Sequence, residues 1–309
     1  MPILDAVTLL RGTRAGSGPD GDGTATLEPP APYAGPTTAV TRSLRPNEEP
    51  GWERVEDYVR LVSRARADDR VVGLVLVGAP GRSATVPPDR CWDVRLVVRD
   101  DAVIACSRVY ETQPDAAVRT RTVGLKDFST ERRTRPLASP DRYEDARADV
   151  VVDKLDGEIA GLVAVGGSLD DDQARRVAQR ALVAYLDACR RSSECVQTGD
   201  TTLSQLETAE SIPHVVTAVF ALHRRVRPPA RYLRWELETH PFEGDEWEAD
   251  RFLTSLRVVA STGAVFEQRN VLCDVEELAR LNGLGHVFDE REHDLAWLRA
   301  AGRSTMRLV

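Results

Sequence analysis

One short stretch of the chain has residue types and spacing that suit metal chemistry. An apolar run, VVGLVLVG at residues 71–78, is followed by a turn at 79–81, and Asp93 and Arg95 then occupy alternate positions of a second apolar run. Residues two apart on a strand face the same side, so two carboxylates at this spacing can share divalent metals that bind a triphosphate. A glycine-containing turn lets backbone N–H groups approach the phosphates. In this chain only the first position of the pair is a carboxylate.

Periodicity predicts the elements that position these residues. Residues 52–68 place apolar side chains on one helical face, and strands are expected at 71–78, 92–100 and 148–157. From Leu169 onward the pattern is helical, and the acidic run Asp170 to Asp172 suits a helix start. The predicted helices there are 169–191, 211–226, 231–240, 249–263 and 273–285. The fold class predicted is α+β, with a mixed sheet and helices followed by an all-helical bundle.

Composition divides the chain into three parts. Residues 1–50 are rich in glycine and proline, and such a segment buries little apolar surface, which indicates a mobile tail or, alternatively, a wrapped extended arm. We expect a sheet domain at 51–165 and a helical domain at 166–309.

Four segments carry a likeness to a known family. They are GLVLVG at 73–78, RYEDARADVVVDKLDG at 142–157, HVVTAVFALHRRVRPPARYLRWELETHPF at 214–242 and VEELARLNGLGHVFDE at 275–290. From about Trp52 to Leu298 the chain resembles a bacterial family of small-molecule nucleotidyltransferases. That family is related to the aminoglycoside adenylyltransferases, within the DNA polymerase beta-like nucleotidyltransferase superfamily. The resemblance implies a nucleotidyltransferase-like domain at 51–165, a helical domain after it, and nucleotide transfer from an NTP with Mg²⁺.

The departures from the family pattern fall on its metal and phosphate positions. The turn that reads Gly-Ser in the family reads Gly78-Ala79 here, and the Asp-x-Asp pair reads Asp93-x-Arg95. A unit charge about 4 Å from another is worth roughly 4 kcal/mol at an effective dielectric near 20, and a divalent ion about doubles it. Arg95 therefore opposes metal binding at Asp93. With Arg82 nearby, it offers a guanidinium that binds phosphate or carboxylate without metal.

The helical domain departs at two further positions. The helix end that resembles Tyr-Arg-Ser-x-Lys keeps Arg191 and Ser192 but ends in Glu194, and the Pro-Tyr-Asn-Lys-Tyr loop has Arg231 in place of lysine. Seven residues are therefore expected to bind substrate or nucleotide: Gly78, Ala79, Arg82, Arg95, Arg191, Ser192 and Arg231.

The third carboxylate of the metal site is open between two residues. Asp149 and Asp153 are four apart on the expected strand and so would share one face, and the resemblance favours Asp153. Asp93 and Asp153 are thus the candidate catalytic and metal-binding residues. The cofactor is Mg²⁺ if the protein is active, and none if it is not.

Three functions remain open from the sequence. In the first, Mg²⁺-dependent transfer is lost and the protein acts as a binding or regulatory partner of another protein. In the second, the same cleft serves small-molecule metabolism with arginines in place of metals. In the third, a weakly active nucleotidyltransferase uses Asp93 and Asp153 to transfer NMP from an NTP to a small-molecule hydroxyl.

Composition excludes several other classes. A net charge of −8 disfavours nucleic acid as a partner, and no apolar stretch approaches the roughly 20 residues that span a membrane. The N-terminal apolar stretch has no basic residue before it, so we expect a cytoplasmic protein. The five cysteines contain no C-x-x-C pair, which argues against zinc and disulfides. The only lysines are Lys126 and Lys154.

Overall fold

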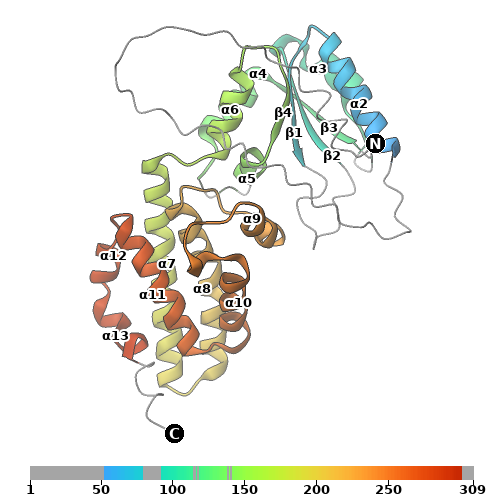
Figure 1. Cartoon of the computed structure of the whole chain (residues 1–309). Coiled ribbons are helices and arrows are strands. Elements are labelled where there is room, and N and C mark those ends of the chain that lie inside the picture. The colour runs from blue at the N-terminus through green and yellow to red at the C-terminus, as the bar shows by residue number, and fades with distance from the viewer. Residues whose placement is uncertain are drawn as a thin grey trace. The chain divides into compact units, whose positions relative to one another are not determined.

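The computed structural model describes residues 52–78, 92–113, 116, 118–137, 139 and 141–300, with backbone only for 52–55 and 78 (Figure 1). The tail predicted at 1–50 and the candidate residues Ala79 and Arg82 lie outside these ranges. The first elements in chain order are α2 (Trp52–Ala67), β1 (Val71–Gly78), β2 (Trp92–Val98), α3 (Val103–Tyr110), β3 (Val118–Gly124), α4 (Leu125–Thr134), α5 (Asp141–Ala146), β4 (Asp149–Asp153) and α6 (Glu158–Gly167).

The strands form one four-stranded mixed sheet in the order β3-β2-β1-β4. Strand β1 pairs antiparallel with β2 and β4, and β2 pairs parallel with β3. The side chains of β1 from Val71 to Val77 are buried, because a strand flanked on both sides needs apolar residues along its whole length. The mixed sheet is as predicted, but β3 and helices α3 to α6 were not individually predicted.

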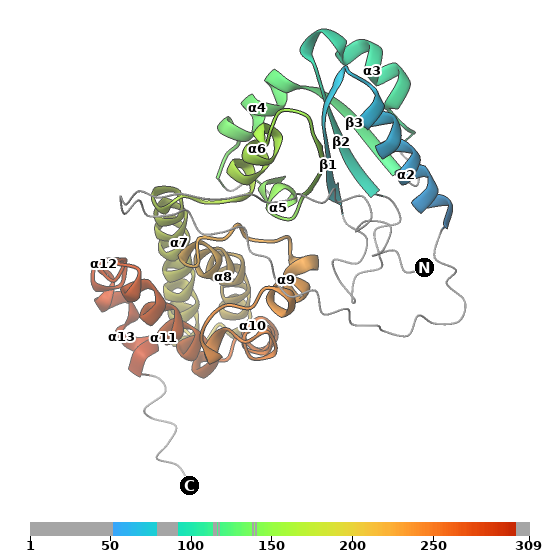
Figure 2. The same ribbon diagram turned by 45° about the horizontal axis from the view of Figure 1, so that its top comes forward.

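Helices α4 and α6 lie on one face of the sheet, and α3 lies on the opposite face (Figures 1 and 2). The first face has a core that includes Val75, Val97, Phe128 and Ile159. Gly73 is required here, since a Cβ at this position would lie 2.9 Å from Cγ1 of Ile159. This face of the sheet therefore has its helices packed at close range.

The chain's two lysines both belong to this sheet-bearing part. Lys126 lies exposed in the first turn of α4. Lys154 directly follows β4, and its Nζ donates to the backbone oxygen of Asp68 at 2.8 Å.

Every element described after β4 and α6 is a helix. They are α7 (Asp171–Gln197), α8 (Thr201–Leu222), α9 (Leu233–Thr239), α10 (Ala249–Thr262), α11 (Val265–Leu281), α12 (His286–Asp289) and α13 (Glu292–Ala300), with short 3-10 turns before α9 and α10. The predicted acidic helix start is confirmed: Asp170 caps α7 in a reciprocal capping box with Gln173, and Asp171 and Asp172 lie in its first turn. Helices α7 and α8 make the most extensive contact of any two elements.

A buried carboxylate connects α5 to the later helices. Glu236 of α9 is 1% exposed, and its Oε2 accepts from the Tyr143 hydroxyl at 2.8 Å and from Nε of Arg147 at 2.9 Å. Its Oε1 accepts from Arg147 and from Arg225. Burial raises the pKa of Glu236, but the two guanidinium groups outweigh burial and hold the net pKa below the usual value.

Two compact units make up the chain, residues 1–61 and 62–309, and the boundary between them falls within α2. Of the first unit, the structure describes residues 52–61, in which Tyr58 and Leu61 are buried. The second unit contains the sheet and helices α3 to α13. The domain boundary predicted between residues 165 and 166 falls inside α6 and stays a prediction. Within the described ranges, no helix combines the length and apolar character needed to cross a bilayer.

Candidate functional site

Four charged residues form a patch on the β2–β3 pair. The parallel register places Asp93 beside Arg119 and Arg95 beside Arg121. Neighbouring positions in register share one face of a sheet, as do residues two apart on a strand. The four side chains therefore share the face of the sheet that α4 and α6 cover, and three of them are guanidinium groups.

The carboxylate of Asp93 is held by Arg119 at both oxygens. Nε of Arg119 lies 2.7 Å from Oδ1, and Nη2 donates to Oδ2 at 2.8 Å. This is the two-pronged geometry that makes arginine–carboxylate pairs specific. The side chains are 43% and 35% exposed, so the pair contributes at most about 1 kcal/mol to folding. The pair also opposes metal binding, because a metal ion at Asp93 must displace the guanidinium group that already contacts both carboxylate oxygens.

Arg95 reaches a carboxylate on a different element. Its Nη2 lies 3.4 Å from Oε2 of Glu144 on α5. Burial raises the pKa of Glu144 although the neighbouring Arg95 lowers it. The contact is longer than a charge-assisted hydrogen bond of about 2.7–2.9 Å, so this guanidinium is held loosely.

A cavity of about 300 Å³ opens beside these residues, between β2, β3, α4 and α5. Its wall includes Arg95, Arg121, Arg132, Arg135 and their acidic neighbours. Within it, the buried Asp145 accepts from Arg132 at 2.8 Å and from Arg135 at 2.6 Å. Arg121, by contrast, makes no hydrogen bond or ion pair with any residue in the described part of the chain. Arg121 is thus an arginine of the cavity wall without a carboxylate partner among the described residues.

Asp93 and Asp153 cannot hold one metal together. Asp93 pairs with Gly78 at the end of β1, whereas Asp153 pairs with Gly73 near its start. Five residues of strand separate these positions by roughly 16 Å, and metal–oxygen bonds are only about 2.0–2.6 Å long. The Asp153 carboxylate instead accepts from the backbone N–H of Leu155 at 3.0 Å and of Ala160 at 3.1 Å, which stabilises the turn into α6. This separation argues against a shared metal, and the catalytic and metal-binding roles predicted for Asp93 and Asp153 stay predictions.

The expectation that Asp149 and Asp153 share a face is also wrong. Leu76 pairs with Asp149 and Leu74 with Val152, and the register shifts between Leu74 and Val75. Because Leu74 and Leu76 face the same side, Asp149 and Val152 also do, and Asp153 faces the other side. The cause is one extra residue in β4, a bulge that inverts the alternation.

The residues present do not fit the Mg²⁺ site that the family resemblance implies. Asp93 is paired with arginine, its alternate neighbour is Arg95, and the two later aspartates lie on opposite faces. Across the residues that the structure describes, no group of three or more metal-binding side chains comes together.

The remaining expected ligand-binding residues are dispersed. Gly78 lies directly opposite Asp93 in the sheet. Arg191 lies 2.7 Å from Glu207, and Arg231 is exposed and stacks over the neighbouring Tyr232 ring. Ser192 is 1% exposed, and its hydroxyl binds Ser204 at 3.1 Å and Thr208 at 2.7 Å between α7 and α8. Ser192 therefore packs between α7 and α8, and its role in ligand binding stays a prediction.

Sequence reasoning missed Arg119 and Arg121, since both lie on the unpredicted strand β3. The sequence of β3, VRTRTVG, alternates between buried and exposed positions. Its first, third and fifth residues are buried, and its second and fourth are exposed. This period of two is typical of a strand with one solvated face.

Comparisons with known proteins do not identify a family for this chain. No protein-family model matches the chain, and no curated protein matches it. A crystal structure of a nucleotidyltransferase-like protein from Exiguobacterium sibiricum 255-15 is similar over 79% of this chain and 88% of that chain, at 12% identity and a TM-score of 0.31. A likeness of this degree is too remote to assign a family or an activity.

Proposed function

We propose that this chain is a nucleotidyltransferase-like protein that has replaced its metal-binding carboxylates with an arginine patch. On this proposal, the patch binds a phosphate-bearing small molecule or nucleotide without Mg²⁺ and performs no Mg²⁺-dependent nucleotidyl transfer. The observation that carries the proposal is that Arg119 contacts both carboxylate oxygens of Asp93. Arg95 lies two residues after Asp93 on β2.

Electrostatics argues against a metal at this position. At about 4 Å and an effective dielectric near 20, one cation repels a divalent ion by roughly 8 kcal/mol. Arg95 and Arg119 both lie next to Asp93, on β2 itself and on its paired neighbour β3. A single carboxylate does not offset two such repulsions, so Mg²⁺ is expected to bind poorly.

The same arrangement favours an anion. Arg121 has no carboxylate partner among the described residues, and Arg95 has a long contact of 3.4 Å to Glu144. Both line one cavity, and a phosphate group can accept hydrogen bonds from both guanidinium groups. The lining carboxylates limit the charge of the site, which suits one phosphate group better than a polyanion.

The test is thermal unfolding of the full chain with each NTP and with inorganic phosphate, in EDTA and in MgCl2. A ligand at about 100 times its dissociation constant stabilises the folded state by roughly 2.7 kcal/mol, a shift of several degrees. We expect a shift in EDTA that Mg²⁺ does not increase, and no release of pyrophosphate. Arg95→Gln combined with Arg121→Gln should remove the shift, while Arg108→Gln, an exposed residue on α3, should keep it.

Two results contradict the proposal. A shift that requires Mg²⁺ and disappears in Asp93→Asn would establish a working metal site. The absence of any shift with all the nucleotides and with phosphate would refute anion binding at the patch.

A further inference from the structure

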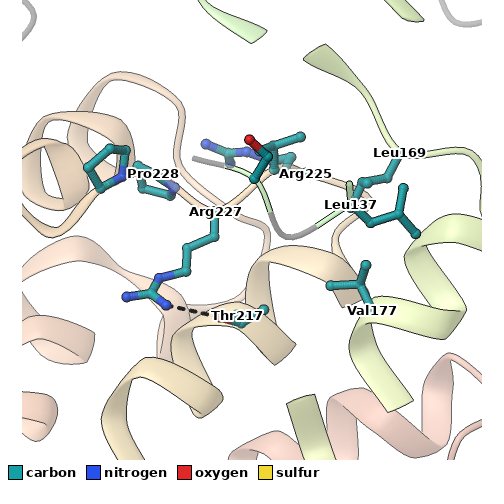
Figure 3. Close-up of a pocket in the computed structure, with 10 residues that line it drawn as sticks. Leu137, Leu169, Val177, Thr217, Arg225, Arg227 and Pro228 are labelled. Atoms are coloured by element: carbon teal, nitrogen blue, oxygen red, sulfur yellow. Dashed lines mark hydrogen bonds between the residues drawn. The ribbon is translucent and has the colours of Figure 1, made fainter. Parts of the chain in front are cut away.

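A second cavity, of about 290 Å³, lies among α7, α8 and the loop before α9 (Figure 3). We call it the Arg227 pocket. Most of its wall is apolar and is made by Leu137, Leu169, Val177, Val226, Pro228 and Pro229. Its volume is at the small end of the roughly 300–1,000 Å³ typical of ligand sites. Such a pocket suits a small molecule with an apolar body.

Arg227 is one of two arginines that line this pocket, and its position is fixed by neutral partners. Its Nη1 donates to the backbone oxygen of Pro213 at 3.1 Å and to Oγ1 of Thr217 at 3.2 Å. Its Nε and Nη2 make no hydrogen bond, and the side chain no ion pair, with any residue for which the structure gives a position. Burial lowers the pKa of Arg227, and no carboxylate opposes this effect. Arg227 is therefore a half-buried cation at the pocket wall, without a counterion among the described residues.

The neighbouring charges do not supply the missing anion. Arg225, also on the wall, binds Glu236 and donates to the backbone oxygen of His240 at 2.7 Å. Glu236 also pairs with Arg147, so one carboxylate serves two guanidinium groups. Arg227 does not share this carboxylate and has no ion pair of its own among the described residues. Partly buried positive charge of this kind is costly unless an anion compensates it.

We propose that the Arg227 pocket binds a small organic carboxylate. The carboxylate accepts hydrogen bonds from the Nε and Nη2 edge of Arg227, and the apolar body packs against Leu169, Val177 and the paired prolines. A monocarboxylate fits better than a phosphate ester, because Arg227 is the one guanidinium of the wall without an ion pair among the described residues and most of the other wall side chains are apolar. The site shares no residue with the Arg95–Arg121 patch, so it stands or fails independently of the proposed function.

The test is isothermal titration of the full chain with straight-chain alkanoates from acetate to decanoate. Each is matched to the alkanamide of the same length, which keeps the body and removes the charge. We expect affinity to rise with chain length until the pocket is full, and the amides to bind at least about tenfold more weakly, since a hydrogen bond to a charged group is lost. Failure of every alkanoate to bind, or equal binding of acids and amides, would overturn the proposal.

Three variants locate the site. Arg227→Gln keeps a donor toward Pro213 but removes the charge, and it should weaken the best alkanoate about tenfold or more. Val177→Phe fills the cavity and should abolish binding while leaving Arg227 intact. Arg224→Gln changes an exposed arginine of the same loop, outside the pocket, and should bind like the wild type. Circular dichroism melts show which variants fold, and unchanged binding by either folded pocket variant would refute the assignment.

Discussion

Replacing Glu236 by glutamine tests the energetics of the buried network that joins α5 to α9. The carboxylate is 1% exposed and is bound by Tyr143, Arg147 and Arg225. Glutamine has nearly the same shape, but it leaves two guanidinium groups without a counterion and turns an NH₂ group toward one of them. Removing one partner from a buried ion pair typically costs about 3–5 kcal/mol. With an unfolding entropy of about 2.1 cal/mol/K per residue, a chain of 309 residues should show a fall in Tm of roughly 5–8 °C.

The assay is a set of four calorimetric melts: wild type, Glu236→Gln, Arg147→Gln and the double variant. Because the residues are in contact, the double variant should lose less stability than the sum of the two single changes. Glu238→Gln is the matched control, since Glu238 is an exposed side chain two residues further on that pairs with Arg234 at 3.1 Å. It should change stability by no more than about 0.5 kcal/mol. A Glu236→Gln protein within about 1 kcal/mol of the wild type would refute the reasoning.

The pH dependence gives a second check on the same residue. The folded pKa of Glu236 lies below its usual value of 4.5. A carboxylate with a lowered folded pKa contributes stability above its unfolded pKa and loses it as the pH falls toward the folded pKa. The stability difference between wild type and Glu236→Gln should therefore be largest at neutral pH and shrink below about pH 4.5. A difference that grows on acidification would contradict the arginine pairing.

Further predictions concern four other residues. His223 stacks on Phe242 and has its pKa lowered from 6.5 to about 4, by burial first and then by the charge of Arg225. The wild type should therefore lose roughly 3 kcal/mol from this residue as the pH falls from about 6.5 to 4, and His223→Phe should show a shallower loss in pH-dependent urea unfolding. Gly73→Ala should destabilise by about 1–3 kcal/mol, because the new methyl meets Ile159 at 2.9 Å. Gly161→Ala, where a Cβ on α6 meets nothing within 4 Å, should stabilise by about 0.5–1 kcal/mol in the same urea assay. Asp145→Asn leaves Arg132 without an ion pair among the described residues, whereas Arg135 keeps its pair with Glu131. A fall of about 3–5 kcal/mol in urea unfolding is expected, and a fall below about 1 kcal/mol would contradict the network.

The sheet and the helical segments were largely predictable because burial leaves a pattern in the residues. Strand β1 is buried along its length and appears as an uninterrupted apolar run. Helix α10 begins at the predicted residue 249 and ends at 262, one residue before the predicted end. Helix α8 was predicted only from residue 211, although it begins at Thr201. Its first half packs through hydroxyl groups, including Ser204 and Thr208, so the apolar period is absent there.

The candidate site was less predictable because it depends on register. The likeness to metal-dependent enzymes led to Asp153, but one additional valine in β4 changes the face on which that aspartate lies. Nothing in a run of identical valines marks the bulged residue. The pairing of Asp93 with Arg119 spans 26 residues of sequence and requires β3 to be recognised first. Local spacing identifies such residues but does not show which of them meet.

The distribution of lysine has a practical consequence for handling the protein. Lys126 and Lys154 both lie in the sheet-bearing part, and no lysine follows residue 154. Among the side chains, amine-reactive dyes, cross-linkers and sensor surfaces will therefore react only with these two lysines. The side chains of α7 to α13 will remain unmodified. Guanidinium groups do not react under the same conditions, so the ion pairs around Glu236 and the cation of the Arg227 pocket keep their charge. A preparation immobilised through its lysine side chains should thus present the helical segment and its pocket intact to solution.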